Sequence, residues 1–289
     1  MSDRLSGKTG LLALIGSPVS HSMSPAMYNY SFERLGIDAC YLAFDVKEEG
    51  VKGAFDAMRL FSMRGMNVTM PDKIEAAKTV DRLSPAARLC GAVNTVVNDG
   101  GVLTGYNTDG EGFVKNLTTR GIEVAGKKVV LIGAGGAAAS IQAQLALDHV
   151  GELALFNKKD GFFSRLTDMK EKLGQETPEV KIGVFDLDET ETLRKEIAEA
   201  DILINATIAG MKPHEDTTVI PDPSFFREGL VVCDTVYNPV ETRLLREAKE
   251  HGAVTVDGKG MLLYQGVVAF KLYTGQDMPV EEVKERFFS

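Results

Sequence analysis

The segment between residues 127 and 138 most constrains what this chain can fold into. A β-branched, apolar run ends there in a glycine turn and continues as alanine-rich sequence; the turn comprises Gly133, Ala134, Gly135, Gly136 and Ala137. Gly133 permits a sharp turn, Gly135 allows the backbone to approach a pyrophosphate, and Ala138 allows close helix–strand packing. The start of the helix offers free N–H groups and a positive dipole end to phosphates. The segment therefore predicts a dinucleotide-binding turn.

The residues around this turn complete a βαβ pattern. A helix over about 135–149 and a strand at Glu152–Asn157 follow it, which favours a nucleotide site over a glycine-rich corner without a ligand. Strands and helices then alternate, with further strands expected at Lys181–Phe185, Asp201–Asn205, Leu230–Asp234 and Ala253–Val256. This alternation predicts an α/β fold with a parallel, doubly wound sheet, a Rossmann domain.

The residues before the turn are numerous enough for a separate α/β domain. Its expected strands are Leu11–Ile15, Cys40–Val46, Gly65–Met70 and the hairpin pair Asn94–Asn98 and Val102–Tyr106; its expected helices include Pro25–Leu35 and Val51–Phe61. Pro71 is expected in the first turn of a helix, and Ser84 is expected to cap another.

The apolar residues after Gly258 predict C-terminal helices that need a partner surface, which folding back onto the first domain supplies. We therefore expect an N-terminal substrate domain of residues 1–109 completed by residues 258–289. The Rossmann domain comprises residues 110–257, with domain crossings at 107–110 and 257–260.

Charge and cysteine content exclude several classes of function. The net charge of −9 argues against nucleic acid or an anionic membrane surface as a partner. No apolar stretch reaches the roughly 20 residues that span a bilayer, and the first residues lack the apolar core of a signal peptide. Three scattered cysteines, Cys40, Cys90 and Cys233, predict buried, reduced thiols rather than a disulfide framework or metal site. We expect a cytoplasmic protein that binds a small molecule and no metal.

Polar clusters outside the glycine turn supply candidate chemistry. Ser22 and Ser24 follow the first strand and can direct two hydroxyls at a carboxylate, although N-capping by Ser24 explains them equally well. Asn67 and Thr69 lie on the same side of a strand end, and Lys73 follows on the first helical turn. Polar groups at that edge are where open α/β sheets bind ligands.

The remaining clusters lie near the expected domain crossings. Asn94 offers a donor and an acceptor to a polyol, and Asp109 either caps the helix that starts near Gly110 or forms a proton-handling pair with Lys73. Tyr237 and Gln265 are expected to enter the cleft from the other side, although Tyr237-Asn238-Pro239 also fits a simple turn.

Seven segments together resemble the shikimate dehydrogenase family, in order and spacing, across essentially the whole chain. They are Ser-His-Ser-Met-Ser-Pro at 20–25, Asn-Val-Thr-Met-Pro-Asp-Lys at 67–73, Gly-Ala-Val-Asn-Thr at 91–95, Tyr-Asn-Thr-Asp-Gly at 106–110, Gly-Ala-Gly-Gly-Ala at 133–137, Asp-Thr-Val-Tyr-Asn-Pro at 234–239 and Gly-Met-Leu-Leu-Tyr-Gln-Gly-Val-Val-Ala-Phe at 260–270. The stretch 157–163 is most similar to the quinate/shikimate dehydrogenase branch.

The resemblance implies a reversible, nicotinamide-dependent reduction of 3-dehydroshikimate to shikimate, a step of aromatic amino acid biosynthesis. It implies that Lys73 and Asp109 are the catalytic pair. It also implies the substrate-binding residues Ser22, Ser24, Asn67, Thr69, Asn94, Tyr237 and Gln265. The implied cofactor-binding residues are those of the glycine turn, together with Asn157, Lys158, Lys159, Asp160, Thr207, Val236, Gly258 and Met261.

The end of the second Rossmann strand carries mixed signals about the cofactor. Lys158 and Lys159 can hold the extra phosphate of NADP, whereas Asp160 accepts from the ribose hydroxyls of NAD and repels a phosphate. NADP-specific relatives carry an Asn-Arg-Thr type motif here, from which this chain departs. We expect NAD to be used well and NADP to be usable.

Two other functions stay open at this point. A quinate dehydrogenase, or a dual quinate/shikimate enzyme of quinate catabolism, differs only by a few contacts near Ser22, Thr69 and Tyr237. A non-catalytic dinucleotide-binding regulator is expected to lack Lys73 or Asp109 and to carry an added DNA-binding segment. This sequence has both residues and shows no such segment. A homodimer is compatible with the sequence.

Overall fold

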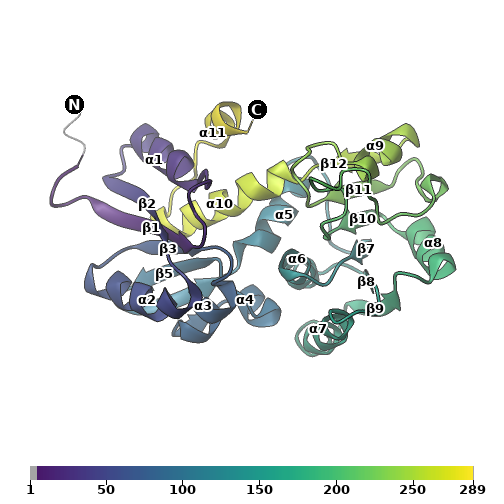
Figure 1. Ribbon diagram of the computed structural model, residues 1–289, viewed down its shortest axis with the longest axis horizontal. Helices are drawn as coiled ribbons and strands as arrows, with labels where there is room; N and C mark the ends of the chain where they lie inside the picture. The colour runs from purple at the N-terminus through teal and green to yellow at the C-terminus, as the bar shows by residue number, and fades with distance from the viewer. Residues whose placement is uncertain (1–4, 289) are drawn as a thin grey trace. The chain divides into compact units, whose positions relative to one another are not determined.

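The structure, a computed structural model, describes residues 5–288, which form two compact units (Figure 1). Unit 1 runs to Thr108 and resumes at Gln265, whereas unit 2 is the single stretch Asp109–Tyr264. The first change of unit falls within the expected crossing at 107–110. The second falls after the expected crossing at 257–260, inside helix α10 (Lys259–Thr274).

Unit 1 contains a six-stranded mixed sheet in the order β2-β1-β3-β5-β6-β4. The strands are β1 (Gly10–Gly16), β2 (Ala39–Asp45), β3 (Gly65–Val68), β4 (Arg82–Leu83), β5 (Thr95–Asp99) and β6 (Val102–Tyr106). Strand β1 pairs in parallel with β2 and β3, and β5 pairs antiparallel with β3 and β6. The expected hairpin at Gly100 and Gly101 is confirmed, whereas β4 carries too few residues to be predicted.

The two faces of this sheet pack against different helices because side chains alternate along each strand. Figure 1 shows α2 (Val51–Leu60), α3 (Lys73–Thr79) and α4 (Pro85–Cys90) on one side, where Ile15, Met66 and Val68 meet Phe55 and Met58 in one core cluster. Helices α1 (Ser24–Leu35) and α10 lie on the other side, and α11 (Val280–Phe287) packs beside α1. Asn67, between Met66 and Val68, therefore faces α1 and α10.

Unit 2 contains a six-stranded sheet that is parallel throughout, in the order β12-β11-β10-β7-β8-β9. Its strands are β7 (Lys128–Ile132), β8 (Glu152–Asn157), β9 (Lys181–Asp186), β10 (Ile202–Asn205), β11 (Val231–Asp234) and β12 (Val254–Val256). The strand order reverses next to β7, so the carboxyl ends of β7 and β10 form the switch point at which such sheets bind ligands.

Helices cover both faces of the unit 2 sheet, as a doubly wound fold requires (Figure 1). They are α5 (Thr108–Thr118), α6 (Gly136–Leu147), α7 (Phe163–Glu176), α8 (Thr190–Glu199) and α9 (Arg243–Glu250). Val130 and Ile132 of β7 pack with Leu193 of α8 and Leu244 of α9. The expected α/β class with a Rossmann sheet is confirmed.

Local expectations have mixed outcomes. Ser84 caps α4, since its hydroxyl accepts from the Ala87 N–H at 3.3 Å. Pro71 does not lie in the first turn of a helix: α3 begins at Lys73, and Pro71 precedes it after a cis peptide bond. Cys40, Cys90 and Cys233 are free, but only Cys233 is buried, so the expectation of three buried thiols is wrong for the other two.

Within residues 5–288, no helix is both long and apolar enough to cross a membrane. Across the same range, His, Cys, Asp and Glu side chains form no group of three or more that could hold a metal ion.

Candidate active site

The candidate substrate residues of unit 1 surround the carboxyl ends of β1 and β3. The Thr69 N–H donates to the Ile15 oxygen at 2.8 Å, and the Ser17 N–H donates to the Met70 oxygen at 3.1 Å. The loop after β1, which leads to Ser22 and Ser24, is therefore bonded directly to the segment that leads from β3 to Lys73.

Ser22 and Ser24 are half-buried neighbours at the start of α1. The Ser24 N–H donates to the Ser22 hydroxyl at 3.3 Å. Ser24 is the first residue of α1, and the cap position is Met23, whose side chain makes no capping hydrogen bond. The capping explanation for Ser24 is therefore wrong, and its side chain instead forms a hydrogen bond with the Tyr41 hydroxyl.

Asn67, Asn94, Thr95 and Thr108 form one buried hydrogen-bonded chain. The Asn67 Nδ2 donates to the Thr95 hydroxyl at 3.0 Å and to the Asn94 backbone oxygen at 3.2 Å. The Thr95 hydroxyl and the Thr108 N–H both donate to Asn94 Oδ1, at 3.0 Å and 2.9 Å. The orientation of both amides is therefore set by their neighbours.

Lys73 is the first residue of α3 and is half-buried, and its backbone oxygen accepts from the Val93 N–H at 2.9 Å. This bond ties the lysine to the segment that carries Asn94. Gln265, in the part of α10 that belongs to unit 1, is also half-buried. The structure thus brings seven predicted residues into unit 1: Ser22, Ser24, Asn67, Thr69, Lys73, Asn94 and Gln265.

Asp72, next to the lysine, was not assigned a role from sequence. It is fully buried, and neither carboxylate oxygen has a hydrogen-bond partner among the described residues. Burial raises the pKa of Asp72, and the negative charges of Glu48, Glu49 and Asp45 raise it further. A buried carboxyl group with a raised pKa therefore lies directly before α3.

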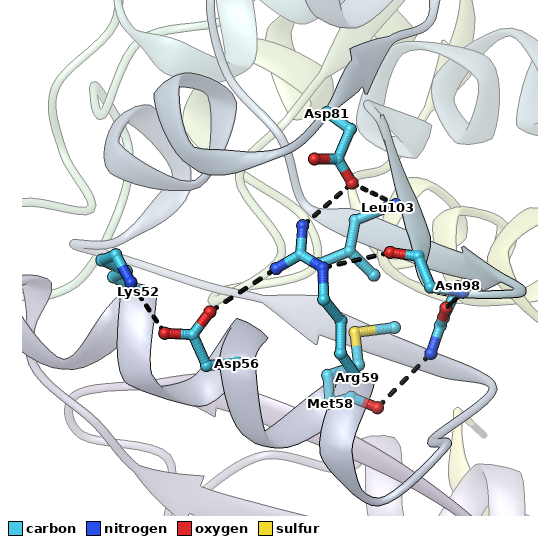
Figure 2. Close-up of polar contacts among 8 residues, drawn as sticks. Lys52, Asp56, Met58, Arg59, Asp81, Asn98 and Leu103 are labelled. Atoms are coloured by element: carbon cyan, nitrogen blue, oxygen red, sulfur yellow. Dashed lines mark hydrogen bonds and ion pairs between the residues drawn. The ribbon is translucent and has the colours of Figure 1, made fainter.

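A surface network fixes α2 to the loop after α3 and to the β5–β6 hairpin (Figure 2). The Arg59 guanidinium donates to Asp81 at 2.9 Å and to the Gly101 backbone oxygen at 3.0 Å. Asp81 also accepts from the Leu103 N–H at 2.7 Å, while Asn98 donates to the Met58 and Met63 oxygens. This network holds the far ends of the elements that carry Lys73 and Asn94.

The predicted residues Asp109 and Tyr237 belong to unit 2. Asp109 is the first residue of that unit and lies, half-buried, in the first turn of α5, which begins at Thr108 rather than near Gly110. Tyr237 is 51% exposed in the loop after β11.

The glycine turn has the geometry that a nucleotide site needs. Gly133 has φ +131°, and a Cβ there would lie 2.7 Å from the Ala206 oxygen, so the turn requires glycine. Gly135 is the cap residue of α6, no described side chain caps that helix, and an added Cβ at Gly135 would meet nothing within 4 Å. The bare N-terminus of α6 therefore fits a pyrophosphate group.

Neighbouring loops of unit 2 lie at the same carboxyl edge of the sheet. The Asp234 carboxylate accepts from Asn205, Thr242 and the Val236 N–H at 3.0, 2.7 and 3.0 Å. Burial raises the pKa of Asp234 to about 6, against the opposite effect of these hydrogen bonds. The Thr207 hydroxyl donates to the Asn205 side chain at 2.7 Å, so Asp234 and Asn205 together position Thr207 and Val236.

Gly258 and Met261 complete the predicted cofactor set. A Cβ at Gly258 would lie 2.5 Å from the Thr235 oxygen, which explains glycine at the point where the loop after β12 passes the end of β11. Met261 is half-buried in the part of α10 that belongs to unit 2.

The charged residues of the loop after β8 bond within that loop and to acidic residues at and after the end of β9. Asp160 accepts from the Phe162 N–H at 2.8 Å and from Asn157 at 3.0 Å. Lys158 pairs with Asp188 at 3.8 Å, and Lys159 pairs with Asp186 at 3.4 Å and with Glu189 at 3.8 Å. Hydrogen bonds from the Asp188 N–H and from Lys159 lower the pKa of Asp186, although burial opposes them. These lysines are therefore surrounded by negative charge.

Comparison with known proteins defines the class to which this site belongs. The family model for the shikimate dehydrogenase substrate binding domain matches residues 14–96, and that for the shikimate 5'-dehydrogenase C-terminal domain matches residues 258–286. A shikimate dehydrogenase (NADP(+)) of Listeria monocytogenes is 47% identical over 288 residues, covering 100% of this chain and 99% of that protein. A quinate/shikimate dehydrogenase of Escherichia coli is 42% identical and covers 97% of both chains.

Solved structures agree with the sequence comparison. The crystal structure of the Listeria monocytogenes shikimate 5-dehydrogenase in complex with shikimate and NAD has a TM-score of 0.96 at 47% identity, covering 99% of this chain and 98% of that one. The protein is thus an oxidoreductase of two-unit, dinucleotide-binding architecture. It belongs to the shikimate dehydrogenase family.

Proposed function

We propose that this protein is a shikimate dehydrogenase that interconverts shikimate and 3-dehydroshikimate with a nicotinamide cofactor. The observation that carries the proposal is the full-length likeness to a Listeria enzyme whose crystal structure holds shikimate and NAD. The lysine, aspartate, serines and amides in the segments that resemble the family also support the proposal, because the reaction needs groups of these kinds. A pathway role in aromatic amino acid biosynthesis is part of this proposal.

The proposed chemistry divides the work between the two units. The glycine turn of unit 2 would hold a nicotinamide cofactor through its pyrophosphate, and the bound cofactor would provide the hydride chemistry. On unit 1, the Lys73 ammonium donates a proton to the ketone oxygen on which negative charge develops, and it takes that proton back in the oxidation direction. Asp109 orients Lys73 and accepts from a neighbouring substrate hydroxyl. Each turnover moves one hydride and one proton, so the reaction balances without a metal.

The remaining residues of unit 1 are proposed to bind the substrate. Ser22 and Ser24 donate to the ring carboxylate, while Asn67, Thr69, Asn94, Gln265 and, from unit 2, Tyr237 bind the ring hydroxyls. The internal bonds of Asn67 and Asn94 support this assignment, because they fix each amide before a ligand arrives.

Steady-state oxidation of shikimate and of quinate, each with NAD and with NADP, tests the function through the absorbance of the reduced nicotinamide. We expect shikimate to be oxidised with a higher kcat/KM than quinate. Turnover of quinate alone identifies a quinate dehydrogenase instead. Absence of turnover with either substrate identifies a non-catalytic binding protein and contradicts the proposal.

Ser22→Ala is expected to raise KM for shikimate by the equivalent of about 1–3 kcal/mol, because one carboxylate oxygen loses its donor. The KM for the cofactor is expected to stay unchanged. Ser224→Ala, in the 3-10 turn Pro223–Phe225 of unit 2, is the matched control. An unchanged KM for shikimate in Ser22→Ala means that the carboxylate binds elsewhere.

We further propose that NAD is the better cofactor. The support is the charge around Lys158 and Lys159, which already pair with three acidic side chains and directly precede Asp160 in the sequence. A 2′-phosphate would have to displace these pairs, whereas ribose hydroxyls can bond to a carboxylate.

The double variant Asp188→Asn/Glu189→Gln is expected to raise kcat/KM for NADP by up to about fivefold, because it removes the acidic partner of Lys158 and one of the two partners of Lys159, exposed pairs worth about 0.2–1 kcal/mol each. Its kcat/KM for NAD is expected to stay the same. Glu171→Gln/Glu250→Gln, at exposed positions of α7 and α9, controls for the loss of two negative charges. A wild-type enzyme that strongly prefers NADP contradicts this cofactor proposal.

The proposal also includes a cytoplasmic location, supported by the three free cysteines. It includes a homodimer, supported by the outer strand β2 of the unit 1 sheet, which exposes Leu42 and Phe44.

A further inference from the structure

A buried tyrosine lies directly beneath the proposed substrate residues of unit 1. Tyr41, in the edge strand β2, is 0% exposed, and its hydroxyl donates to Asn67 Oδ1 at 2.7 Å. The Ser24 side chain also interacts with this hydroxyl. One phenol group thus lies between a residue proposed for the carboxylate and a residue proposed for the ring hydroxyls.

The ring of Tyr41 is held by its own packing and does not depend on a ligand. It stacks on Tyr28 of α1 with ring centroids 4.5 Å apart and planes 10° apart. Tyr28 is fixed in turn, because its hydroxyl donates to the Gly266 oxygen at 2.9 Å and its ring contacts Phe270 and Tyr273 of α10. The Tyr41 hydroxyl is therefore a rigid, prearranged donor.

The direction of each bond follows from the groups involved. The Asn67 Nδ2 faces the Thr95 hydroxyl and the Asn94 backbone oxygen, and a flipped amide would bring two oxygens together there. Asn67 Oδ1 accordingly faces Tyr41 and needs a donor, which the phenol supplies. The Thr95 hydroxyl accepts from Asn67 Nδ2 and donates to Asn94 Oδ1, so the donor direction is the same along the whole chain of bonds.

We propose that Tyr41 is a positioning residue, which fixes the Asn67 amide directly and the Asn94 amide through Thr95. This inference rests on the proposed function, because it takes Asn67 and Asn94 as ligands of the substrate hydroxyls. Tyr41 itself is 0% exposed, so in this proposal it acts through the two amides.

The electrostatics of the cluster are consistent with a permanent donor. Burial raises the pKa of Tyr41 well above its usual range, and the neighbouring Tyr28 and Tyr273 raise it further, whereas Ser24 lowers it. The phenol therefore stays protonated throughout the working range of the enzyme. Its removal is expected to change affinity without changing the shape of the pH–rate profile.

Tyr41→Phe tests the proposal, because it deletes the donor and keeps the stacked ring. We expect KM for shikimate to rise by about fivefold to tenfold, since a buried amide oxygen loses its partner. The KM for NAD and the pH–rate profile are expected to stay unchanged. Tyr30→Phe is the matched control: it deletes a tyrosine hydroxyl of the same unit that bonds Glu282 at 2.8 Å, on the surface between α1 and α11.

A second step separates positioning from a general loss of stability. In an Asn67→Ala background, adding Tyr41→Phe is expected to cause no further rise in KM for shikimate, because the group that Tyr41 orients is gone. Thr95→Val, which breaks the next link, is expected to raise the same KM and leave that for NAD unchanged. This variant provides the test if Tyr41→Phe does not fold.

The outcomes are distinguishable from failure of the proposed function. If the wild-type protein does not oxidise shikimate, the function proposal fails before any variant is measured. If the wild type is active but the shikimate KM is unchanged in Tyr41→Phe or in Thr95→Val, the positioning role is wrong. Equal rises in KM for shikimate and NAD, or additive effects with Asn67→Ala, overturn it as well.

Discussion

Lys73→Ala is expected to lower kcat for shikimate oxidation by about 10²–10⁴-fold, while shikimate still binds. In the proposed mechanism, the substitution removes both the group that takes up the proton of the shikimate hydroxyl during oxidation and the positive charge that stabilises the alkoxide. Lys73 is the first residue of α3, and its backbone bond to Val93 does not involve the side chain, so the fold is expected to persist. Single-turnover kinetics and equilibrium shikimate binding measure the two effects separately.

Two further variants test whether the loss is specific to Lys73 and whether it depends on Asp109. Lys78→Ala, on the same helix, removes a lysine that pairs with Glu75 at 3.0 Å at the surface, and it is expected to keep full activity. Asp109→Asn is expected to lower kcat, and the double variant with Lys73→Ala to be scarcely worse than Lys73→Ala alone, because the proposal has the two side chains handle the same proton. An active Lys73→Ala enzyme, or fully additive losses, contradicts the proposed pair.

Gly133→Ala is expected to lower the free energy of unfolding of unit 2 by about 2–4 kcal/mol and to abolish NAD binding at ordinary concentrations. The residue has φ +131°, which L side chains rarely adopt, and the new Cβ would lie 2.7 Å from a backbone oxygen of Ala206. That oxygen belongs to the backbone directly after β10, which cannot be rotated away like a side chain. The clash is therefore expected to be relieved by a shift of the nucleotide-binding turn.

The comparison is with Gly174→Ala in the last turn of α7, where an added Cβ would meet nothing within 4 Å. This substitution is expected to raise the free energy of unfolding by about 0.5–1 kcal/mol, because alanine favours helix. Thermal unfolding followed with and without NAD measures both variants. Equal stabilities would show that the turn tolerates a side chain and that its glycine is not required.

The Rossmann half of the molecule could be predicted well from sequence, and the reason is local. The strand β8 has the bounds Glu152–Asn157 that its apolar residues indicate, and Gly133 and Ala138 have the turn and packing roles that their residue types imply. Buried parallel strands are continuous apolar runs, so their pattern survives without knowledge of their neighbours.

The substrate half contains features that depend on contacts between distant residues. The Tyr41–Asn67 hydrogen bond joins positions 26 residues apart, and Tyr28 reaches Gly266 across 238 residues. No periodicity encodes such pairs. The burial of Tyr41 and of Asp72 also cannot be predicted from their residue types, because tyrosine and aspartate are often exposed. Pro71 was misplaced because its residue type fits both a first helical turn and the loop before a helix.

The discontinuous make-up of unit 1 has a consequence for biosynthesis. Unit 2 is one uninterrupted stretch, so it can fold as soon as residues 109–264 have left the ribosome. Unit 1 must wait for its last segment, because Phe270 and Tyr273 of α10 complete the aromatic cluster around Tyr28. The nascent chain is thus expected to acquire its nucleotide-binding half first, and to hold an incomplete, apolar N-terminal sheet until α10 has been synthesised.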